Sequence, residues 1–403
     1  MKREDCIYVG IDLHKETHTA VILNCFNKKL GEITFNNIPS DYSKLLKKVN
    51  KCCPDDKEVV YGLENVYGYG RTLAVWLLER NCIVKDVNPS VSNRQAKHRG
   101  AMYKKSDRDD AQAIALATIN LLDTLPNAHP DEGYWALSLL VHRRDNIMRQ
   151  RIRLVNQLHE QLCMAYPEYK TFFCDIGRPT ALYFWRKYPS RRYLQEMSAE
   201  ELSKDLKEIS HNRVSVKSCE RILESIKADK LPDSIHQESR DAVTVGIVDD
   251  LMHYDKQLKS VEEEMARLYH AMNCTLTTIP GIHIITAVKI LSCIGDIYRF
   301  STPNKLAQFA GIAPLRLSSA GKGKDMVQKQ GNGRLRATMY FLAIQSIQTS
   351  AKGKARNPIF REYFDKRVKE GKNKKQILIC ISRRLINIIY GMLKNGTEYR
   401  LER

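Results

Sequence analysis

The first part of the chain alternates short apolar segments with polar turns. Short segments rich in β-branched side chains indicate strands, and apolar residues that recur at steps of three and four indicate helices. On this basis we expect strands over 6–13, 18–26, 30–35, 58–63 and 82–87, and helices over 40–51, 71–80 and 106–122. Three strands joined by short turns and followed by strand, helix, strand and helix is the order of an RNase H-like fold, so we predict an α/β domain over residues 1–125.

The middle of the chain, residues 126–272, has a helical pattern with two long segments, 141–162 and 247–272. In the second segment, apolar residues occupy two positions of a seven-residue repeat, namely Leu251, Tyr254, Leu258, Val261, Met265, Leu268 and Met272. A helix packed within its own domain and a coiled coil that joins two subunits both fit this pattern. The polar stretch 190–241 has no clear periodicity.

The last part, residues 273–403, is predicted to form a mostly helical and strongly basic domain. Its segment Ile279-Pro280-Gly281-Ile282 is typical of the turn in a helix-hairpin-helix element, which presents backbone N–H groups to a phosphate. Residues 301–403 hold 22 Lys and Arg against 6 Asp and Glu, a net charge of +16, whereas the whole chain has a net charge of +19. A surplus concentrated in this way indicates a polyanionic partner, and nucleic acid is favoured over an anionic membrane.

Other features of the composition exclude several classes of protein. The chain has no apolar run of about 18 residues, the length that a membrane-spanning helix needs, and no signal peptide follows Met1. The 11 cysteines lack C-x-x-C spacing, so they indicate neither a disulfide framework nor a zinc site and fit a reducing cytosol. His14 and His18 do not form a zinc motif either. We therefore expect a cytoplasmic protein without a membrane partner.

Four carboxylates occupy positions that indicate shared chemistry. Asp12 and Glu64 each follow an apolar strand, and Asp107 and Asp110 lie three residues apart at the start of a predicted helix. That spacing places the last two on one face of the helix, with Ser106 as the N-cap residue. Phosphoryl transfer on DNA uses two Mg²⁺ ions roughly 3.5–4 Å apart, which three or four carboxylates can hold, and Mn²⁺ can replace them.

A plainer interpretation exists for each of these acids. Acidic residues are common at strand ends, and Asp107 and Asp110 also suit the positive end of a helix dipole. Asp109 is the neighbouring acid that could take the place of Asp107 or Asp110 in the site, although its spacing from Asp107 places it on a different face of the helix. Asp12 is the hardest to explain in this way, because it lies within a strongly apolar segment.

Several motifs together resemble the DEDD transposases of insertion sequences, the IS110 family of bridge-RNA-guided recombinases. The N-terminal motifs are Tyr8-Val9-Gly10-Ile11-Asp12-Leu13-His14-Lys15, the segment of Glu64, and Lys105-Ser106-Asp107-x-x-Asp110-Ala111. The C-terminal motifs are Ile279-Pro280-Gly281-Ile282, the runs 306–314 and 329–336, Ser318-Ser319-Ala320-Gly321-Lys322, and the run 383–390. The resemblance covers nearly the whole chain except the middle, and the joint order of both motif sets makes it specific.

The resemblance implies a RuvC-like N-terminal domain and a serine nucleophile in the C-terminal domain. The catalytic carboxylates of the family, which bind Mg²⁺ or Mn²⁺, correspond to Asp12, Glu64, Asp107 and Asp110. The nucleophile forms a phosphoserine bond to the cut DNA strand and follows the family's Gly-x-x-Pro turn by five positions, which selects Ser319. The family's usual Ser-Gly pair is Ser319-Ala320 in this chain, and the adjacent Ser318 keeps the assignment open.

The family further implies donor and target DNA, a structured guide RNA, and assembly into a homodimer or homotetramer on the nucleoid of a bacterial or archaeal cell. The expected function is site-specific strand exchange that excises and inserts a mobile element. A RuvC-like Holliday-junction endonuclease is the first alternative, and it would cut with metal-activated water and form no covalent link to DNA. A non-catalytic nucleic-acid-binding protein is the second, and the presence of all four acids argues against it.

Overall fold

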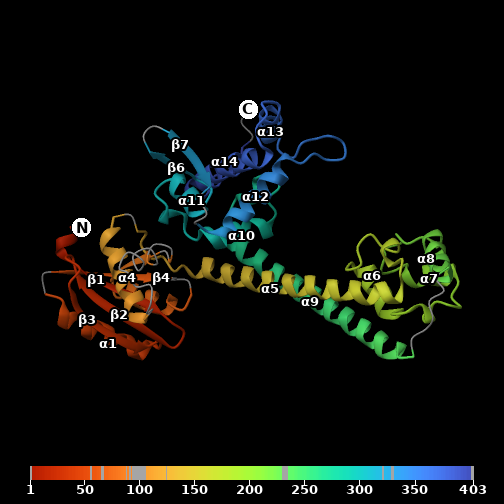
Figure 1. Ribbon diagram of the computed structural model, residues 1–403, viewed down its shortest axis with the longest axis horizontal. Helices are drawn as coiled ribbons and strands as arrows, with labels where there is room; N and C mark the ends of the chain where they lie inside the picture. The colour runs from red at the N-terminus through yellow and green to blue at the C-terminus, as the bar shows by residue number, and fades with distance from the viewer. Residues whose placement is uncertain are drawn as a thin grey trace. The chain divides into compact units, whose positions relative to one another are not determined.

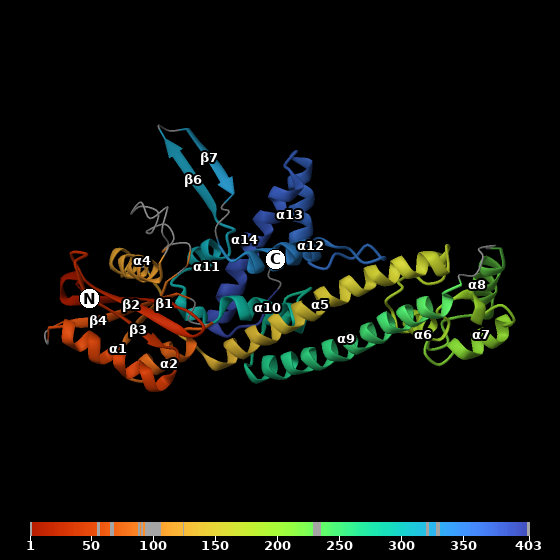
Figure 2. The same ribbon diagram turned by 60° about the horizontal axis from the view of Figure 1, so that its bottom comes forward.

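The computed structural model describes residues 2–54, 57–64, 68–87, 89, 92, 106–123, 125–228, 235–319, 322–327 and 331–400, and the side chains of 314–319 and 322–327 fall outside the description. The chain folds into two compact units (Figure 1, Figure 2). The first unit contains Met1–Ser138 and Tyr269–Arg403, and the second contains Leu139–Leu268. The three-domain division expected from the sequence, with boundaries near 125 and 272, stays a prediction.

A five-stranded mixed sheet forms the N-terminal part of the chain (Figure 2). Its strands are β1 (Cys6–Leu13), β2 (Thr17–Asn24), β3 (Lys29–Asn36), β4 (Glu58–Glu64) and β5 (Ile83–Val87). The spatial order is β3-β2-β1-β4-β5, in which the first three strands are antiparallel and β4 runs parallel to both β1 and β5. This is the strand order of an RNase H-like domain, so the predicted fold class is confirmed.

The alternation of side chains along β1 builds a separate core on each face of the sheet. Odd-numbered residues such as Val9 pack with helices α1 (Pro39–Cys52) and α2 (Arg71–Leu78). Even-numbered residues such as Tyr8 pack with α4 (Asp107–Asn120). Both side chains are fully buried, which explains why the stretch Cys6–Ile11 of β1 has no charged residue.

Gly10 in β1 allows α4 to lie unusually close to the sheet. A Cβ atom at this position would overlap the backbone of Ala111 and Ala115 in α4, and backbone atoms of a packed helix cannot move out of the way alone. A Cβ atom at Gly62, in the neighbouring strand β4, would meet the side chain of Thr118 in the same helix. The two glycines therefore set the distance at which the start of α4 meets the ends of β1 and β4.

We expect Gly10→Ala to destabilise the protein by about 2–3 kcal/mol, because the added methyl group must push α4 away from the sheet. Gly246→Ala is the matched control. It lies in helix α9 (Gln237–Ala271), where a Cβ atom has nothing within 4 Å and where alanine favours the helix by roughly 0.5–1 kcal/mol. Thermal melting followed by circular dichroism measures both, and an unchanged melting temperature for Gly10→Ala would contradict the close packing.

In the second unit, α9 lies antiparallel to the long helix α5 (Glu132–Ala165). The direction follows from two ion pairs, Arg144–Glu262 and Arg151–Asp255. Among the heptad positions of α9, Leu251 and Met265 are fully buried. The heptad pattern is therefore satisfied at these positions within one chain, which favours the interpretation of a helix packed in its own domain.

The polar stretch 190–241 folds around an aromatic core. It contributes helices α7 (Ala199–Leu206) and α8 (Val216–Ala228), which pack with α6 (Pro179–Lys187). Phe184 and Trp185 in α6 are fully buried and cross at 89° with their ring centres 4.9 Å apart. The predicted helical middle is thus confirmed. Phe184 and Trp185, which organise its core, precede the polar stretch 190–241 in the sequence.

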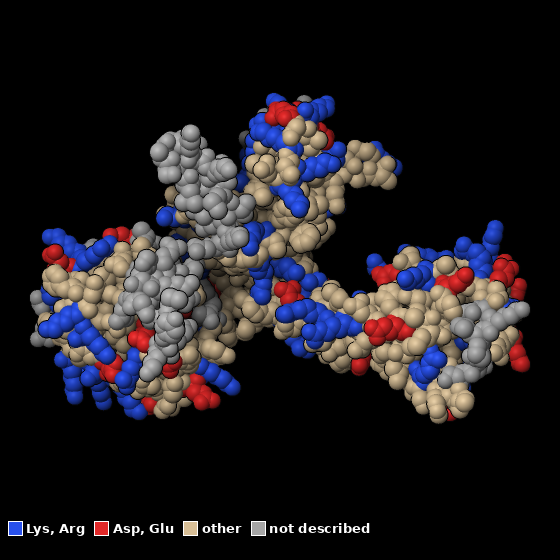
Figure 3. Space-filling model, viewed as in Figure 1, with Lys and Arg blue, Asp and Glu red and all other residues tan. Residues whose placement is uncertain are grey.

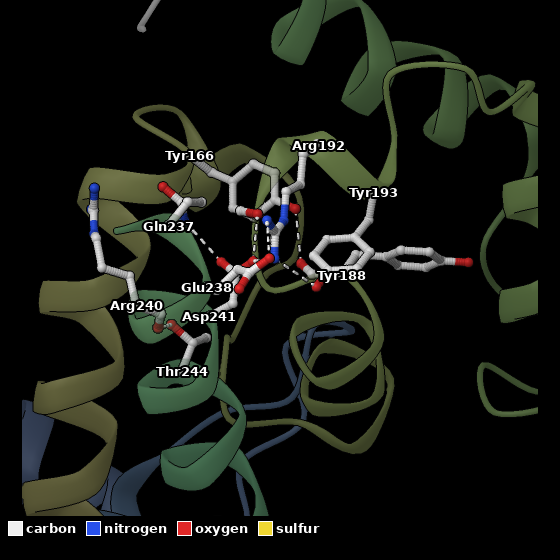
Figure 4. A network of polar contacts seen from close by, with 10 residues as sticks. Tyr166, Tyr188, Arg192, Tyr193, Gln237, Glu238, Arg240, Asp241 and Thr244 are labelled. Carbon is white, nitrogen blue, oxygen red and sulfur yellow. Dashed lines mark hydrogen bonds and ion pairs between the residues drawn. The ribbon is translucent and has the colours of Figure 1, made fainter. Parts of the chain in front are cut away.

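A buried carboxylate connects this core to the start of α9 (Figure 4). Asp241 is only 4% exposed, and it accepts a hydrogen bond from the Ser190 hydroxyl at 3.1 Å. The Arg192 guanidinium lies 2.8 Å from the same carboxylate. Because a buried charge is unfavourable without such partners, the network holds the segment around Arg192 against α9.

Helices also dominate the described C-terminal residues, so the predicted mostly helical domain is confirmed. They are α10 (Ile284–Ile294), α11 (Pro303–Phe309), α12 (Gly333–Ile347), α13 (Pro358–Lys369) and α14 (Lys374–Asn395). An antiparallel hairpin of β6 (Pro314–Ser319) and β7 (Lys322–Val327) lies between α11 and α12. The predicted helix-hairpin-helix is wrong in its first half. Only the three-residue 3-10 turn Leu276–Thr278 precedes the bend, at which Gly281 has a φ of +97°.

Among the described residues, α14 is the one helix long and apolar enough to cross a membrane, with a mean hydropathy of 1.4. The helix contacts α11, α12 and α13 in the same domain. Of its apolar window, 44% is buried. These contacts are those of a core helix in a folded domain, so α14 is weak evidence for a membrane segment.

Candidate active site at the ends of β1 and β4

The two N-terminal acids lie at the ends of adjacent parallel strands. Asp12 is the second-to-last residue of β1, and Glu64 is the last residue of β4. The register pairs Ile11 with Leu63, so the two acids follow one residue later on strands about 4.8 Å apart. Each acid comes two residues after a glycine that faces α4. Because side chains alternate along a strand, both acids belong to the face that α4 covers.

The third acidic motif begins α4 on this face. The Ser106 hydroxyl accepts a hydrogen bond from the backbone N–H of Asp109 at 3.3 Å and donates one to its carboxylate at 2.7 Å. The predicted N-cap is therefore confirmed, and Asp109 takes part in capping. Asp107 and Asp110 remain as the first and fourth residues of the helix.

His14 joins the acid of β1 to an acid of α4. Its Nε2 atom lies 3.0 Å from Oδ2 of Asp12 and 3.4 Å from Oδ1 of Asp107. One ligand atom from each of the three residues lies within 4.8 Å of the other two. The three side chains therefore form one cluster, although their positions in the sequence span almost a hundred residues.

His14 was not predicted as a site residue, because it was weighed as a metal ligand only together with His18. The two histidines do not share a site. His18 is fully buried between Phe35 and Tyr42, whereas the side chain of His14 is 51% exposed. The available signal was the Asp-x-His spacing at the end of an apolar strand, where the chain leaves the sheet.

The electrostatics of the cluster favour a bound cation. Burial raises the pKa of Asp12 above its ordinary value; His14 lowers it, and the nearby charges of Asp110 and Asp107 raise it again. The Asp12 side chain is only 15% exposed, so water screens this repulsion poorly. Carboxylate oxygens are the preferred ligands of Mg²⁺, and an imidazole is acceptable to softer divalent ions. The donor set therefore fits a divalent cation.

A separate hydrogen bond orients Glu64. The hydroxyl of Ser92, a residue only 4% exposed, donates to its carboxylate. The strand register places Glu64 beside Asp12, and the Ser92 hydroxyl holds the carboxylate of Glu64. Of the four predicted acids, Asp12 and Asp107 thus belong to the cluster, Asp110 acts on Asp12 through its charge, and Glu64 lies on the adjoining strand.

The two candidate serines occupy a β-hairpin of the C-terminal domain. They are the last residues of β6, where Ser318 pairs with Gly323 and Ser319 pairs with Lys322 of β7. Their side chains lie outside the description. Five residues of the resemblance motifs, Lys105, Ala320, Gly321, Lys329 and Gln330, also lie outside the described residues. The joining of this hairpin to the acidic cluster therefore stays a prediction.

Comparison with known proteins gives the same family at both ends of the chain. Residues 9–167 match the transposase family of the DEDD IS110 type, and residues 273–364 match the family described as Transposase IS116/IS110/IS902. The chain is 22% identical over 400 residues to an uncharacterized 43.6 kDa protein of insertion element IS110 from Streptomyces coelicolor, which covers 98% of this chain and 95% of the relative. It is 24% identical over 408 residues to the corresponding 44.8 kDa protein of IS116 from Streptomyces clavuligerus, with 98% and 96% covered.

Two further similarities are more limited. A pilin gene-inverting protein of Moraxella bovis is 25% identical over 202 residues, which are 47% of this chain and 60% of the relative. Among solved structures, T. thermophilus RuvC in complex with a Holliday junction substrate is 15% identical with a TM-score of 0.25, and the match covers 30% of this chain and 99% of that chain.

The family matches and the sites coincide along the chain. The first match begins within β1 and includes Asp12, Glu64, Asp107 and Asp110, and the second includes the hairpin of Ser319. The insertion-element relatives extend over almost the whole length of both chains. The chain therefore belongs to the IS110 family of transposases, enzymes that cut and recombine DNA.

Proposed function

We propose that this transposase moves an insertion element by metal-dependent cleavage and exchange of DNA strands, with a serine as the nucleophile and a structured RNA as the guide. The cluster of Asp12, His14 and Asp107 carries the proposal. Its ligand atoms lie within 4.8 Å of one another beside the N-terminal end of α4. A largely buried carboxylate that is repelled by acidic neighbours, as Asp12 is by Asp107 and Asp110, is typical of a cation site at which phosphate chemistry occurs.

Each residue of the cluster has a distinct task in this proposal. Asp12, Asp107 and Asp110 hold the cation, and Glu64 completes the set from the adjoining strand. Two Mg²⁺ ions, or Mn²⁺ in their place, would be held by these acids and would supply the positive charge that activates an attacking hydroxyl and stabilises the leaving oxygen. His14 keeps the carboxylates of Asp12 and Asp107 in place through its Nε2 atom.

Ser319 is the proposed nucleophile, with Ser318 as the competing position. Its Oγ loses a proton and bonds to phosphorus, while the ester bond to the leaving strand breaks and the leaving oxygen takes up a proton. One phosphodiester replaces another, so the reverse reaction on a second strand rejoins DNA without an external energy source. The relative named as a pilin gene-inverting protein supports such strand exchange over simple hydrolysis.

The charge distribution supports the nucleic-acid partners of the proposal. The net charge of +16 over residues 301–403 suits both donor and target DNA and a guide RNA, because each presents a line of phosphates. Two ends of an element must be cut together before they can be exchanged. We therefore propose a homodimer or homotetramer that acts in the cytoplasm on nucleoid DNA.

Removal of divalent metal tests this function directly. The substrate is a plasmid that carries the coding region of this protein and the DNA on either side of it. We expect the purified protein to nick and rejoin this plasmid when Mg²⁺ and an RNA transcribed from the flanking DNA are present. With EDTA in place of Mg²⁺, product should fall to background, because the clustered acids then repel without a cation. Gel electrophoresis of the plasmid forms measures the result. Equal cleavage in EDTA would remove the metal from the proposal.

A further inference from the structure

The second unit carries a row of arginines on α5, and two of them hold α5 against α9. Nε of Arg144 lies 2.6 Å from Glu262, and Nε of Arg151 lies 2.6 Å from Asp255. Both guanidiniums are partly buried, with 17% and 23% of their side chains exposed. These two residues therefore have a structural task within the helix pair.

Three neighbouring arginines on α5 have no such partner. Arg143 donates a hydrogen bond to the neutral Gln257 side chain at 2.7 Å. Arg149 donates to the side chain of Asn146 at 2.5 Å and to a backbone carbonyl at 3.3 Å. Arg153 forms no polar contact within the part of the chain that the structure describes. All three are exposed, and none of them forms an ion pair with a described residue.

The three arginines line one groove between the two helices, with a volume of about 410 Å³. Its lining consists of Arg143, Asn146, Ile147, Arg149, Gln150, Arg153, His253, Tyr254 and Gln257. No carboxylate is among the described residues that line it. On the face in Figure 3, Lys and Arg side chains gather on the α5–α9 pair. We call this surface the arginine groove.

The spacing of the charges suits an extended polyanion. Arg143 and Arg153 are ten residues apart, so they lie roughly 15 Å apart along the helix axis, and Arg149 lies between them. One strand of a B-form duplex advances about 3.4 Å per phosphate, so the groove spans about four phosphates. Guanidinium groups bind phosphate oxygens through two parallel N–H groups, and the Asn, Gln and His side chains of the lining offer further polar contacts.

We propose that the arginine groove binds the phosphodiester backbone of a nucleic acid. The ordinary alternative is a basic helix face that is exposed to solvent and binds no ligand, but on such a face acidic residues usually alternate with the basic ones. Here acids pair with Arg144 and Arg151 and are missing from the lining of the groove. The proposal deepens the proposed function and rests on it for the nature of the partner. It adds a contact outside the acidic site and outside the basic C-terminal domain.

The test replaces all three groove arginines by glutamine in the full-length protein. Lys207→Gln, Lys217→Gln and Lys227→Gln together are the matched control, because they remove the same charge from exposed positions of the same unit. Binding to a random-sequence DNA duplex, a DNA single strand and an RNA hairpin is measured without Mg²⁺ over a series of salt concentrations. A variant with Arg143, Arg149 and Arg153 all changed to lysine keeps the charge and tests whether charge alone suffices.

We expect the glutamine variant to bind at least about tenfold more weakly at about 0.1 M salt with one or more of the probes. The slope of log affinity against log salt should fall by about 2–3, since each phosphate contact contributes about 0.7–0.9. The probe with the largest loss identifies the kind of nucleic acid. The lysine variant should keep most of the slope, and the control should match wild type.

Equal affinity and slope for the glutamine variant and the control, with all three probes, overturn the proposal and leave an acidic protein surface as the partner to consider. This failure is separate from failure of the proposed function. The binding assay contains no metal and detects no cleavage, whereas the plasmid assay depends on the acidic cluster. Melting curves like that of wild type show that the variants are folded.

Discussion

Asp12→Asn is expected to reduce DNA strand cleavage at least about a thousandfold while DNA binding stays near the wild-type level. Asp12 is the most buried acid of the cluster, and its carboxylate lies 3.0 Å from His14. The substitution keeps the size of the side chain and removes the charge that would hold the proposed cation. Metal ions contribute several kcal/mol to transition-state stabilisation in such sites, and each 1.4 kcal/mol is about a factor of ten in rate. Single-turnover cleavage of a labelled plasmid gives the rate.

Asp109→Asn is the matched control for this substitution. It changes an acid of the same helix turn, but Asp109 contacts Ser106 and helps to cap α4. We expect cleavage by this variant within about threefold of wild type and a stability loss of about 0.5–1 kcal/mol. If both variants cleave at similar rates, the cluster is not where the chemistry occurs.

Stability provides a second readout for Asp12→Asn that does not depend on activity. Burial raises the pKa of Asp12, so its protonation is easier in the folded than in the unfolded protein, and folding gains stability as the pH falls through the raised pKa. Asparagine imitates the neutral form, so the metal-free variant should melt at a higher temperature than wild type at neutral pH. Added Mg²⁺ should raise the melting temperature of wild type more than that of the variant.

Ser319→Ala is expected to abolish the covalent protein–DNA adduct completely. Alanine has no oxygen that could bond to phosphorus, so no phosphoserine can form. Denaturing gel electrophoresis of a reaction with radiolabelled DNA detects the adduct as a protein band that carries label. Strand exchange in the plasmid assay should disappear with it, because the bond that stores the cut end is never made.

Ser318→Ala is the matched control, since it removes the neighbouring hydroxyl from the same strand. It should keep both the adduct and strand exchange, and the opposite result would move the nucleophile to Ser318. Normal cleavage without any adduct in Ser319→Ala would instead favour the RuvC-like endonuclease, in which metal-activated water attacks. Asp12→Asn should also lose the adduct, because in the proposed mechanism the cation activates the serine.

Most of the N-terminal fold could be predicted from local pattern. The strands follow runs of β-branched residues, and β1 matches its predicted bounds because side chains on both of its faces are buried. The start of α4 was predictable because Ser106 forms a local hydrogen bond with the third residue after it. The middle of the chain was harder. Phe184 and Trp185 pack into a core with residues of α7 and α8, and the buried Asp241 binds Ser190, which is 51 residues away in the sequence.

The bend at Gly281 shows where a local motif misled. A Pro-Gly turn before an apolar segment predicted a hairpin between two helices, and the helix after it, α10, is present. Before it, the chain forms only a single 3-10 turn around the buried Leu276. The bend at Gly281 forms as its local sequence predicts. The length of the helical segment before it, a single 3-10 turn, depends on packing against other parts of the domain.

The sequence by itself determined the succession of strands and helices along the N-terminal part of the chain and the capped start of α4, because each depends on neighbours within a few residues. Only the tertiary structure decided that His14 stands between Asp12 and Asp107, and that α4 lies close enough for Asp110 to affect Asp12. The physical reason is the contact of Gly10 with the backbone of α4. A missing side chain leaves no periodic signal in the sequence, yet it sets the distance between groups almost a hundred residues apart.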